Sequence, residues 1–409
     1  MLDVSWRRNL WILWIATTID GVAFSEVIPF LSLYVEQLGN YSKGELSILS
    51  GMVYAASFFV VFFTAPIWGR FADKHGRKRM VLQTSLGSAI TLALMAFVGN
   101  AWELIGLRTL QGFFAGVIPN ATALVATETP KEHAGYAMGI ITTGYVGGML
   151  VGPIIGGFLA HAVTIRVSFI ITGLLLFGSF VLSATMVKEH FHPSKKNKKE
   201  SLFDIHFLKD FPNPRVVIWL MISTVIVQIG LFSIYPIISL LVKQLMHNRG
   251  PITIVAGIIA SLPGIAMFMT SSTLGKISDH YGANKVLILG YLFTVAFYVP
   301  QTFITSLVLL GVFRFLVGIS NAAVYPIIQT MLTKVSPTGS TGLAFSMNQS
   351  AQALGAVLGS MMGSEVASYF GYSSAFMLSA ILQGINLILI LKFVPELRWN
   401  AHNILNSHD

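Results

Sequence analysis

The sequence predicts an all-helical integral membrane protein with twelve transmembrane helices, arranged as two pseudo-symmetric six-helix bundles. Three observations lead to this prediction. Of the 409 residues, 54% are hydrophobic and only 11% are charged, whereas soluble domains carry about 25% charged residues. The apolar residues form runs of about 20, the length that a helix needs to cross a bilayer. The second half of the chain also repeats features of the first. The chain has no cysteine, which excludes a secreted disulfide scaffold.

Twelve apolar runs follow one another along the chain. Their approximate limits are residues 9–35, 45–67, 79–98, 102–126, 135–160, 165–187, 215–242, 252–274, 285–304, 306–333, 341–366 and 372–394. The first run is long, contains Asp20 and is not followed by a small-residue cleavage site, so we do not expect a cleaved signal peptide.

The distribution of Lys and Arg predicts the orientation of these spans. With a cytoplasmic N-terminus, twenty of the 26 cations lie on the inner side and four lie outside, at Lys43, Arg166, Lys243 and Arg249. This bias predicts that both termini are cytoplasmic. The polar stretch 188–214 is then a cytoplasmic linker between an N-terminal bundle, residues 1–187, and a C-terminal bundle with a short tail, residues 215–409. The net charge of +9 therefore indicates a membrane and not a nucleic acid.

The two halves match after a shift of 206 or 207 positions. Rare charged residues and glycines inside each half coincide: Gly69, Asp73 and Gly76 with Gly275, Asp279 and Gly282; Arg108 and Gly112 with Arg314 and Gly318; Gly152 and Gly156 with Gly359 and Gly363. Two parallel repeats place a substrate site near the middle of the membrane, reached by rocking one half against the other.

Three motifs carry a resemblance to a known family. The loop Gly69–Arg79 resembles the signature loop of the major facilitator superfamily. The stretch Gly144–Gly157 resembles the motif of its proton-coupled antiporters, and Arg108–Gly112 is similar to its third motif. The resemblance covers the whole chain and is closest to bacterial twelve-helix drug:proton antiporters. It implies a multi-pass protein of the bacterial cytoplasmic membrane that exports amphipathic, cationic or lipophilic drugs in exchange for protons.

Two regions are candidates for gating. The first is the signature loop, where the chain leaves the membrane after the second span; its candidate residues are Gly69, Asp73, Gly76 and Arg77. A carboxylate there can accept hydrogen bonds from a helix start, where the macrodipole is positive, and the resemblance implies a partner near Thr341. The second copy keeps Asp279 but lacks the cations that match Arg77 and Lys78, so we expect it to be weaker.

The other gating candidate is the fifth span, with Gly152, Pro153 and Gly156. A proline inside a helix removes one backbone hydrogen bond and bends it, and small residues let helices approach closely. We interpret this segment as a hinge and seal, while a glycine stripe alone is also explained by packing.

Ionisable residues inside the spans are expensive and usually mark ion pathways. At about 1.5 Å per residue, Asp20 lies near the midplane, Glu26 lies toward the outer leaflet, and the depth of Arg108 falls between them. We expect one of the two carboxylates to take up and release the coupled proton, with a cationic substrate competing for it. The alternative is a fixed ion pair with Arg108 that only joins the first and fourth spans. Arg314 mirrors Arg108 but has no acid in the seventh span, which leaves backbone carbonyls or a lipid headgroup as partners.

The substrate pocket is expected at the centre of the bundles. Its polar and aromatic candidates at middle depth are Phe24, Asn120, Tyr145, Gln228, Tyr235, Asn321, Tyr325, Asn348 and Gln352. Aromatic rings and one acid suit lipophilic cations. Interhelical packing and hydrogen bonding are the alternative for each of these residues.

The sequence contains no nucleotide-binding loop, metal-ligand cluster or nucleophile–base pair. We therefore expect a transporter that is not an enzyme, has no cofactor or metal and is driven by a proton gradient. Its expected partners are small amphipathic molecules, protons and membrane lipids, with no nucleic acid, and it is expected to be a monomer. Two other functions stay open: an exporter or flippase of a lipid-linked or glycosylated molecule, and a non-transporting membrane receptor or scaffold.

Overall fold

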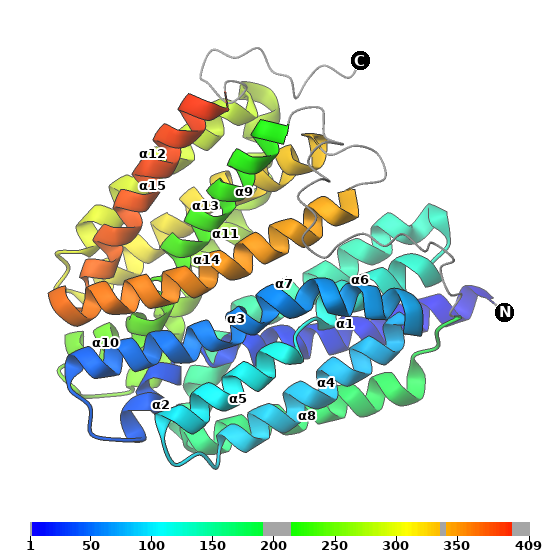
Figure 1. Cartoon of the computed structure of the whole chain (residues 1–409), viewed down its shortest axis with the longest axis horizontal. Helices are drawn as coiled ribbons and strands as arrows, with labels where there is room; N and C mark the ends of the chain where they lie inside the picture. Colours follow the sequence, from blue (N-terminus) through cyan, green and yellow to red (C-terminus); the bar gives the residue numbers. More distant parts are fainter. Residues whose placement is uncertain (1, 191–213, 336–340, 395–409) are drawn as a thin grey trace. The chain divides into compact units, whose positions relative to one another are not determined.

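The protein is described by a computed structural model, which covers residues 2–190, 214–335 and 341–394 (Figure 1). In these ranges the chain forms α-helices, one short 3-10 helix and no strand. The helices are α1 (Leu2–Glu26), α2 (Leu31–Gln37), α3 (Lys43–His75), α4 (Arg77–Met95), α5 (Ala101–Phe113), α6 (Val117–Glu128), α7 (Ala134–Ala162), α8 (Ile165–Met186), α9 (Pro214–Phe232), α10 (Tyr235–Leu245), α11 (Ile252–Tyr281), α12 (Ala283–Gln301), α13 (Leu307–Val335), α14 (Thr341–Phe370) and α15 (Ser374–Phe393). The predicted all-helical class is confirmed.

Three of the predicted spans are broken into two helices. The first span breaks between α1 and α2, which are bent by 50°, and Pro29 lies in the break. The seventh span breaks between α9 and α10, where Pro236 stands at the start of α10. Proline cannot donate a helical hydrogen bond and disfavours a helical residue before it. The fourth span breaks between α5 and α6 at Gly116, whose φ of 126° is in the region that favours glycine.

The described residues contain nine helical segments long and apolar enough to cross a membrane, or ten if the bent pair α1–α2 is one span. The helices α4 and α14 occupy two of the twelve predicted positions and are not among these nine segments. The multi-pass architecture is therefore confirmed, whereas the number of twelve spans and the position of the termini stay predictions.

The chain divides into two compact units. The first contains Met1–Asn40, Ala56–Leu202 and Pro251–Ile258; the second contains Tyr41–Ala55, Phe203–Gly250 and Ile259–Asp409. Each unit thus holds most of one sequence half and one short segment of the other half. Most of the predicted linker, residues 191–213, lies outside the described residues, so the predicted domain boundaries stay a prediction.

Each unit contains helix pairs that pack backbone against backbone, among them α1 with α7 and α9 with α14. A Cβ atom at Gly148 or Gly156 of α7 would lie 2.3 Å from the Thr18 carbonyl oxygen or 2.4 Å from the Glu26 carbonyl oxygen of α1. In the second unit, a Cβ atom at Gly363 of α14 would lie 2.1 Å from the Ser233 carbonyl oxygen, just beyond the end of α9. Only glycine fits such distances, which is the usual basis of close helix packing in membranes. The glycine repeat found in the sequence therefore corresponds to a real packing repeat.

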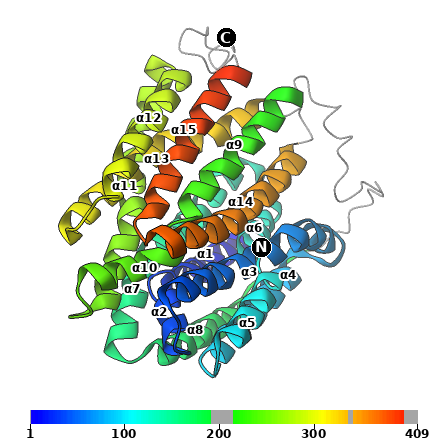
Figure 2. The same cartoon turned by 60° about the vertical axis from the view of Figure 1, so that its left-hand side comes forward.

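Other pairs complete the two units. Figures 1 and 2 show α4 beside α8 in the first unit and α12 beside α15 in the second, where these pairs are in contact. A buried polar network joins α9, α12 and α15: Asn386 Nδ2 lies 2.9 Å from the Tyr291 hydroxyl, which lies 3.0 Å from Ser223 Oγ. Hydrogen bonds of this kind hold helices together in lipid, at about 0.6 kcal/mol each on average.

Candidate functional site

Glu26 is the last residue of α1, and its carboxylate is buried against α8. The residue is 1% exposed, and the Thr172 hydroxyl donates a hydrogen bond to Glu26 Oε1. The α7 backbone also approaches this point, because Gly152 and Gly156 leave room for the main chain of α1 at Glu26. The break of α1 before Pro29 and the glycines of α7 together place an acid in a tightly packed corner. We call Glu26 and Thr172 the carboxylate corner.

Asp20 lies on the same helix, six residues before Glu26. The residue is half-buried, and in the described part of the chain no side chain or backbone group hydrogen-bonds or ion-pairs with its carboxylate. Six helical residues correspond to a rotation of about 120° between the two carboxylates. The two acids therefore point to different sides of α1, as the sequence predicts, and they do not share a hydrogen bond.

Arg108 lies on α5 and is buried, with 5% of its surface exposed. Its Nη1 donates to Gln111 Oε1 at 2.6 Å, a partner on the same helix. Neither Asp20 nor Glu26 forms an ion pair with Arg108 in the structure as far as it is described. Glu26 and Arg108 are therefore buried and Asp20 is half-buried, but the fixed acid–arginine pair, the alternative to coupling, is not formed among the described residues.

Four predicted pocket residues of the second unit lie on α13 and α14. Asn348 Nδ2 donates to Gln329 Oε1 at 3.0 Å, and Tyr325 also hydrogen-bonds with Gln329. Gln329 connects these two candidates and was missed by the sequence analysis, which selected polar residues by depth alone. Asn321 on α13 and Gln352 on α14 are half-buried.

The other pocket candidates have separate surroundings. Phe24 is 38% exposed and packs edge-to-face on Phe58, with ring centroids 6.1 Å apart. The side-chain amide of Asn120 donates to the Gly116 carbonyl at 2.7 Å, so it gives a hydrogen bond to a backbone carbonyl at the break between α5 and α6. Gln228 is buried on α9, and its Oε1 has no hydrogen-bond partner among the residues described.

Two further candidates, Tyr145 and Tyr235, are half-buried on α7 and at the start of α10. Substrate binding by these nine candidates stays a prediction.

The gating candidates are only partly visible. Gly69, Asp73 and the expected partner region near Thr341 lie outside the residues whose side-chain surroundings the structure describes. Gly76 has a φ of 96° and turns the chain between α3 and α4, and Gly282 with a φ of 100° does the same between α11 and α12. Asp279 is exposed near the end of α11.

The gating candidate Pro153 is inside α7. Its carbonyl oxygen would lie 2.2 Å from a Cβ at Gly257, so the two backbones are in contact there. The role of this segment as a hinge stays a prediction.

A different carboxylate, Glu189, occupies the start of α4. Its Oε1 accepts from the Arg77 backbone amide at 2.7 Å and its Oε2 from the Lys78 amide at 2.9 Å. Backbone amides in the first turn of a helix have no partner inside the helix, and together with the positive end of the helix dipole they favour an anion. The sequence analysis missed Glu189 because it lies 112 positions from Arg77, and no local spacing signals such a contact.

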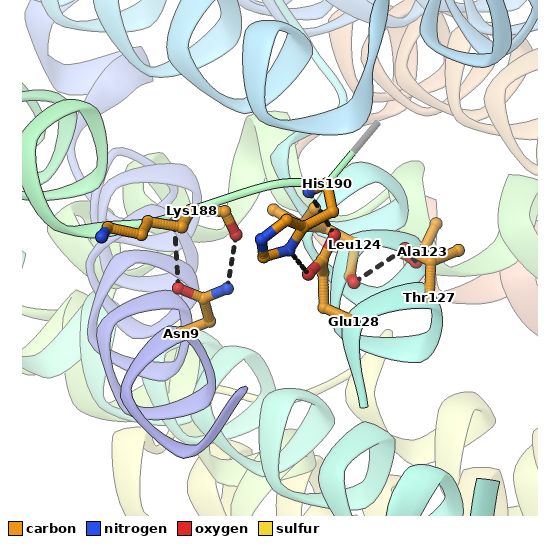
Figure 3. Close-up of polar contacts among 7 residues, drawn as sticks. All are labelled: Asn9, Ala123, Leu124, Thr127, Glu128, Lys188 and His190. Carbon is orange, nitrogen blue, oxygen red and sulfur yellow. Dashed lines mark hydrogen bonds and ion pairs between the residues drawn. The ribbon is translucent and has the colours of Figure 1, made fainter. Parts of the chain in front are cut away.

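The same segment after α8 is fixed to two other helices (Figure 3). Asn9 of α1 forms two hydrogen bonds with the backbone of Lys188, at 2.6 and 3.0 Å. Glu128 of α6 accepts from the His190 amide at 2.7 Å and pairs with its Nδ1 at 2.9 Å. With Glu189 on α4, three helices thus hold residues 188–190, which we call the α8 clasp.

No group of three or more His, Asp or Glu residues in the described ranges is arranged to hold a metal ion.

Comparison with known proteins now assigns the family. The family model of the Major Facilitator Superfamily matches residues 13–255 and 220–404, nearly the whole chain. The chain belongs to the major facilitator superfamily. Among curated proteins, it is 39% identical over 385 residues to the multidrug resistance protein MdtG of Escherichia fergusonii, with 94% of each chain covered. The MdtG protein of Salmonella arizonae is 39% identical over 379 residues, with 93% of each covered.

Solved structures show the same fold at low sequence identity. The nucleoside transporter NupG, in its D323A mutant, matches with a TM-score of 0.79 and 14% identity, over 94% of this chain and 99% of that chain. A D-xylose-proton symporter matches with a TM-score of 0.76 and 14% identity, over 98% of this chain and 100% of that one. The chain is therefore a multi-pass transporter of the cytoplasmic membrane and not an enzyme.

Proposed function

We propose that this protein is a secondary active transporter that exports amphipathic, cationic or lipophilic drugs in exchange for protons. The curated relatives, which match over almost their whole length, are named multidrug resistance proteins. The broader statement, drug efflux by a major facilitator transporter, rests on this similarity. The finer statement, proton exchange, rests on the carboxylate corner.

The observation that supports proton coupling best is the burial of Glu26 with no cation paired with its carboxylate among the described residues. A charged acid inside a membrane helix costs about 2.5–3.5 kcal/mol on insertion scales, and the donor to Glu26 in the described part of the chain is a neutral hydroxyl, that of Thr172. Binding a proton removes the charge and therefore most of this cost. A proton taken up from the outside would neutralise the corner, and its release inside would restore the charge.

Asp20 supplies the second ionisable group on α1. Its carboxylate is half-buried and has no partner among the described residues, so it is available to a cationic substrate. If a cation beside Asp20 and a proton on Glu26 both leave, two uncompensated negative charges remain on α1, which is unfavourable. Competition for negative charge on a single helix thus links export of one to import of the other.

The direct test is to measure proton release when ethidium is added to purified protein. We expect release from the wild type and strongly reduced release from Glu26→Gln or Asp20→Asn. Glu365→Gln is the matched control, because Glu365 is exposed near the end of α14. Unchanged release from both test variants would exclude these acids as the proton carriers. Ethidium efflux without any proton flux would exclude exchange itself, and headgroup-selective lipid translocation would favour a flippase.

A further inference from the structure

Arg314 on α13 is a fully buried cation without a hydrogen-bond partner. The residue is 0% exposed, and Nε, Nη1 and Nη2 all lack an acceptor in the part of the chain that the structure describes. The backbone carbonyls that the sequence offers as partners are therefore not used. A buried charge with no compensating group is strongly unfavourable, so a fixed cation in this position calls for an anion during the working cycle.

The equivalent arginine of the first half shows what Arg314 lacks. Arg108 donates to Gln111, three residues further along α5. The residue three positions after Arg314 is Val317, a buried apolar side chain. The second copy thus has the arginine without this local acceptor. This difference argues against a purely structural arginine, because a structural one would be expected to keep its partner.

The surroundings of Arg314 contain hydrogen-bond donors but no acid. Tyr298 of α12 and Tyr235 of α10 are the titratable groups that interact electrostatically with its guanidinium. Tyr298 is 2% exposed, and Tyr235 is half-buried. The acids of neighbouring elements, Asp279 of α11 and Glu365 of α14, are exposed and form no ion pair with Arg314 in the described ranges, so they leave its charge uncompensated there. All three members of this group belong to the second unit.

We propose that Arg314, Tyr235 and Tyr298 form an anion-binding site. A guanidinium offers up to five N–H donors and binds carboxylate or phosphate oxygens through two parallel bonds. Two phenol hydroxyls add further donors, and the burial of the group strengthens each bond to an anion. The ligand is an anionic group that accepts hydrogen bonds from the guanidinium. It comes either from a free inorganic anion or from the anionic end of an exported molecule, because both have the same chemistry at the arginine.

The site is tested by the anion dependence of unfolding of the purified, full-length protein in a neutral detergent. A ligand that binds the folded state raises the unfolding temperature as its concentration rises. The probes are chloride and octanoate, each compared with a large buffer sulfonate at equal ionic strength, and octanamide as the neutral match of octanoate. No drug or proton gradient is present, so the result is independent of the proposed export function.

For the wild type we expect the unfolding temperature to rise with chloride, with octanoate or with both, and not with octanamide. A response to chloride as well as octanoate identifies a free-anion site, and a response to octanoate alone identifies the anionic end of a larger molecule. In Arg314→Gln we expect the anion response to weaken, so that the half-saturating anion concentration rises at least about tenfold. Arg314→Lys keeps part of the response, and Arg249→Gln, an exposed arginine of the same unit, keeps all of it.

A second measurement separates binding from folding. Without added anion, Arg314→Gln is expected to be at least as stable as the wild type, because it removes an uncompensated buried charge. Tyr298→Phe, which keeps the ring, is expected to weaken the anion response by a smaller factor. No anion response in the wild type, or the same response in Arg314→Gln and Arg314→Lys as in the wild type, would overturn the proposal.

Discussion

Glu26 and Ser233 stand at equivalent places in the two halves, 207 positions apart. Each is next to a glycine of the facing helix, Gly156 or Gly363, whose Cβ would lie under 3 Å from its carbonyl oxygen. Each also hydrogen-bonds with a hydroxyl 146 positions further along the chain: Thr172 for Glu26, and Ser379 at 2.8 Å for Ser233. The backbone arrangement at this point is therefore repeated in both halves, whereas the acid occurs in the first half and a serine takes its place in the second.

This difference separates packing from chemistry. Ser233 and Ser379 are two neutral hydroxyls that hydrogen-bond with each other and with the Gly230 carbonyl, so both are satisfied at this point. The first half places a carboxylate in the same frame and gives it a single neutral donor. The frame itself is thus structural in both halves, and the acid is the addition that a structural role does not require.

The largest expected effect comes from making the first half like the second. Glu26→Ser is expected to keep the fold, because serine already fits this frame at position 233, and to abolish gradient-driven ethidium efflux in reconstituted vesicles. The matched change in the second half, Ser233→Ala, is expected to keep efflux near the wild-type rate. Efflux by Glu26→Ser that still follows the pH gradient would show that the acid is dispensable.

The next effect concerns the shared packing. Gly156→Ala and Gly363→Ala each force a methyl group against a carbonyl oxygen, and over-packing of this kind costs about 1–3 kcal/mol. Both variants are expected to unfold at lower temperature, but only Gly156→Ala also displaces Glu26 and impairs efflux. Gly178→Ala, where no atom lies within 4 Å, is the control and is expected to change stability by less than about 0.5 kcal/mol. Equal efflux in both packing variants would argue against a role in transport that Glu26 has and Ser233 lacks.

A smaller effect is expected from the hydroxyl partners. Thr172→Val removes the donor to Glu26, and Ser379→Ala removes the partner of Ser233. Each loss costs about 0.6 kcal/mol of stability and at most about 1.7. We expect Thr172→Val to change the pH dependence of efflux as well, whereas Ser379→Ala changes only the unfolding temperature. An identical pH profile for Thr172→Val and the wild type would remove Thr172 from the coupling site.

The smallest effects are expected at the α8 clasp. Glu189→Gln removes an anion from the start of α4, typically worth about 0.3–1 kcal/mol. His190→Gln affects an ion pair whose histidine side chain is 60% exposed, worth at most about 1 kcal/mol. Thermal unfolding at low and high salt measures both, and we expect the Glu189 variant to be the less stable one. A larger loss in His190→Gln would mean that the clasp depends on its exposed pair.

The sequence by itself determined the membrane class, the helical content and the family, because these follow from apolar run length, scarce charge and motifs along one chain. It also located the glycine repeat and the acids Asp20 and Glu26, since glycines and charges are rare enough in apolar helices to be noticed. Only the tertiary structure decided which groups meet. Contacts between distant segments place Thr172 at Glu26 and Glu189 at the start of α4. They also leave Arg314 without a hydrogen-bond partner among the described residues. Such contacts are fixed by packing in three dimensions, so no spacing within a single helix reports them.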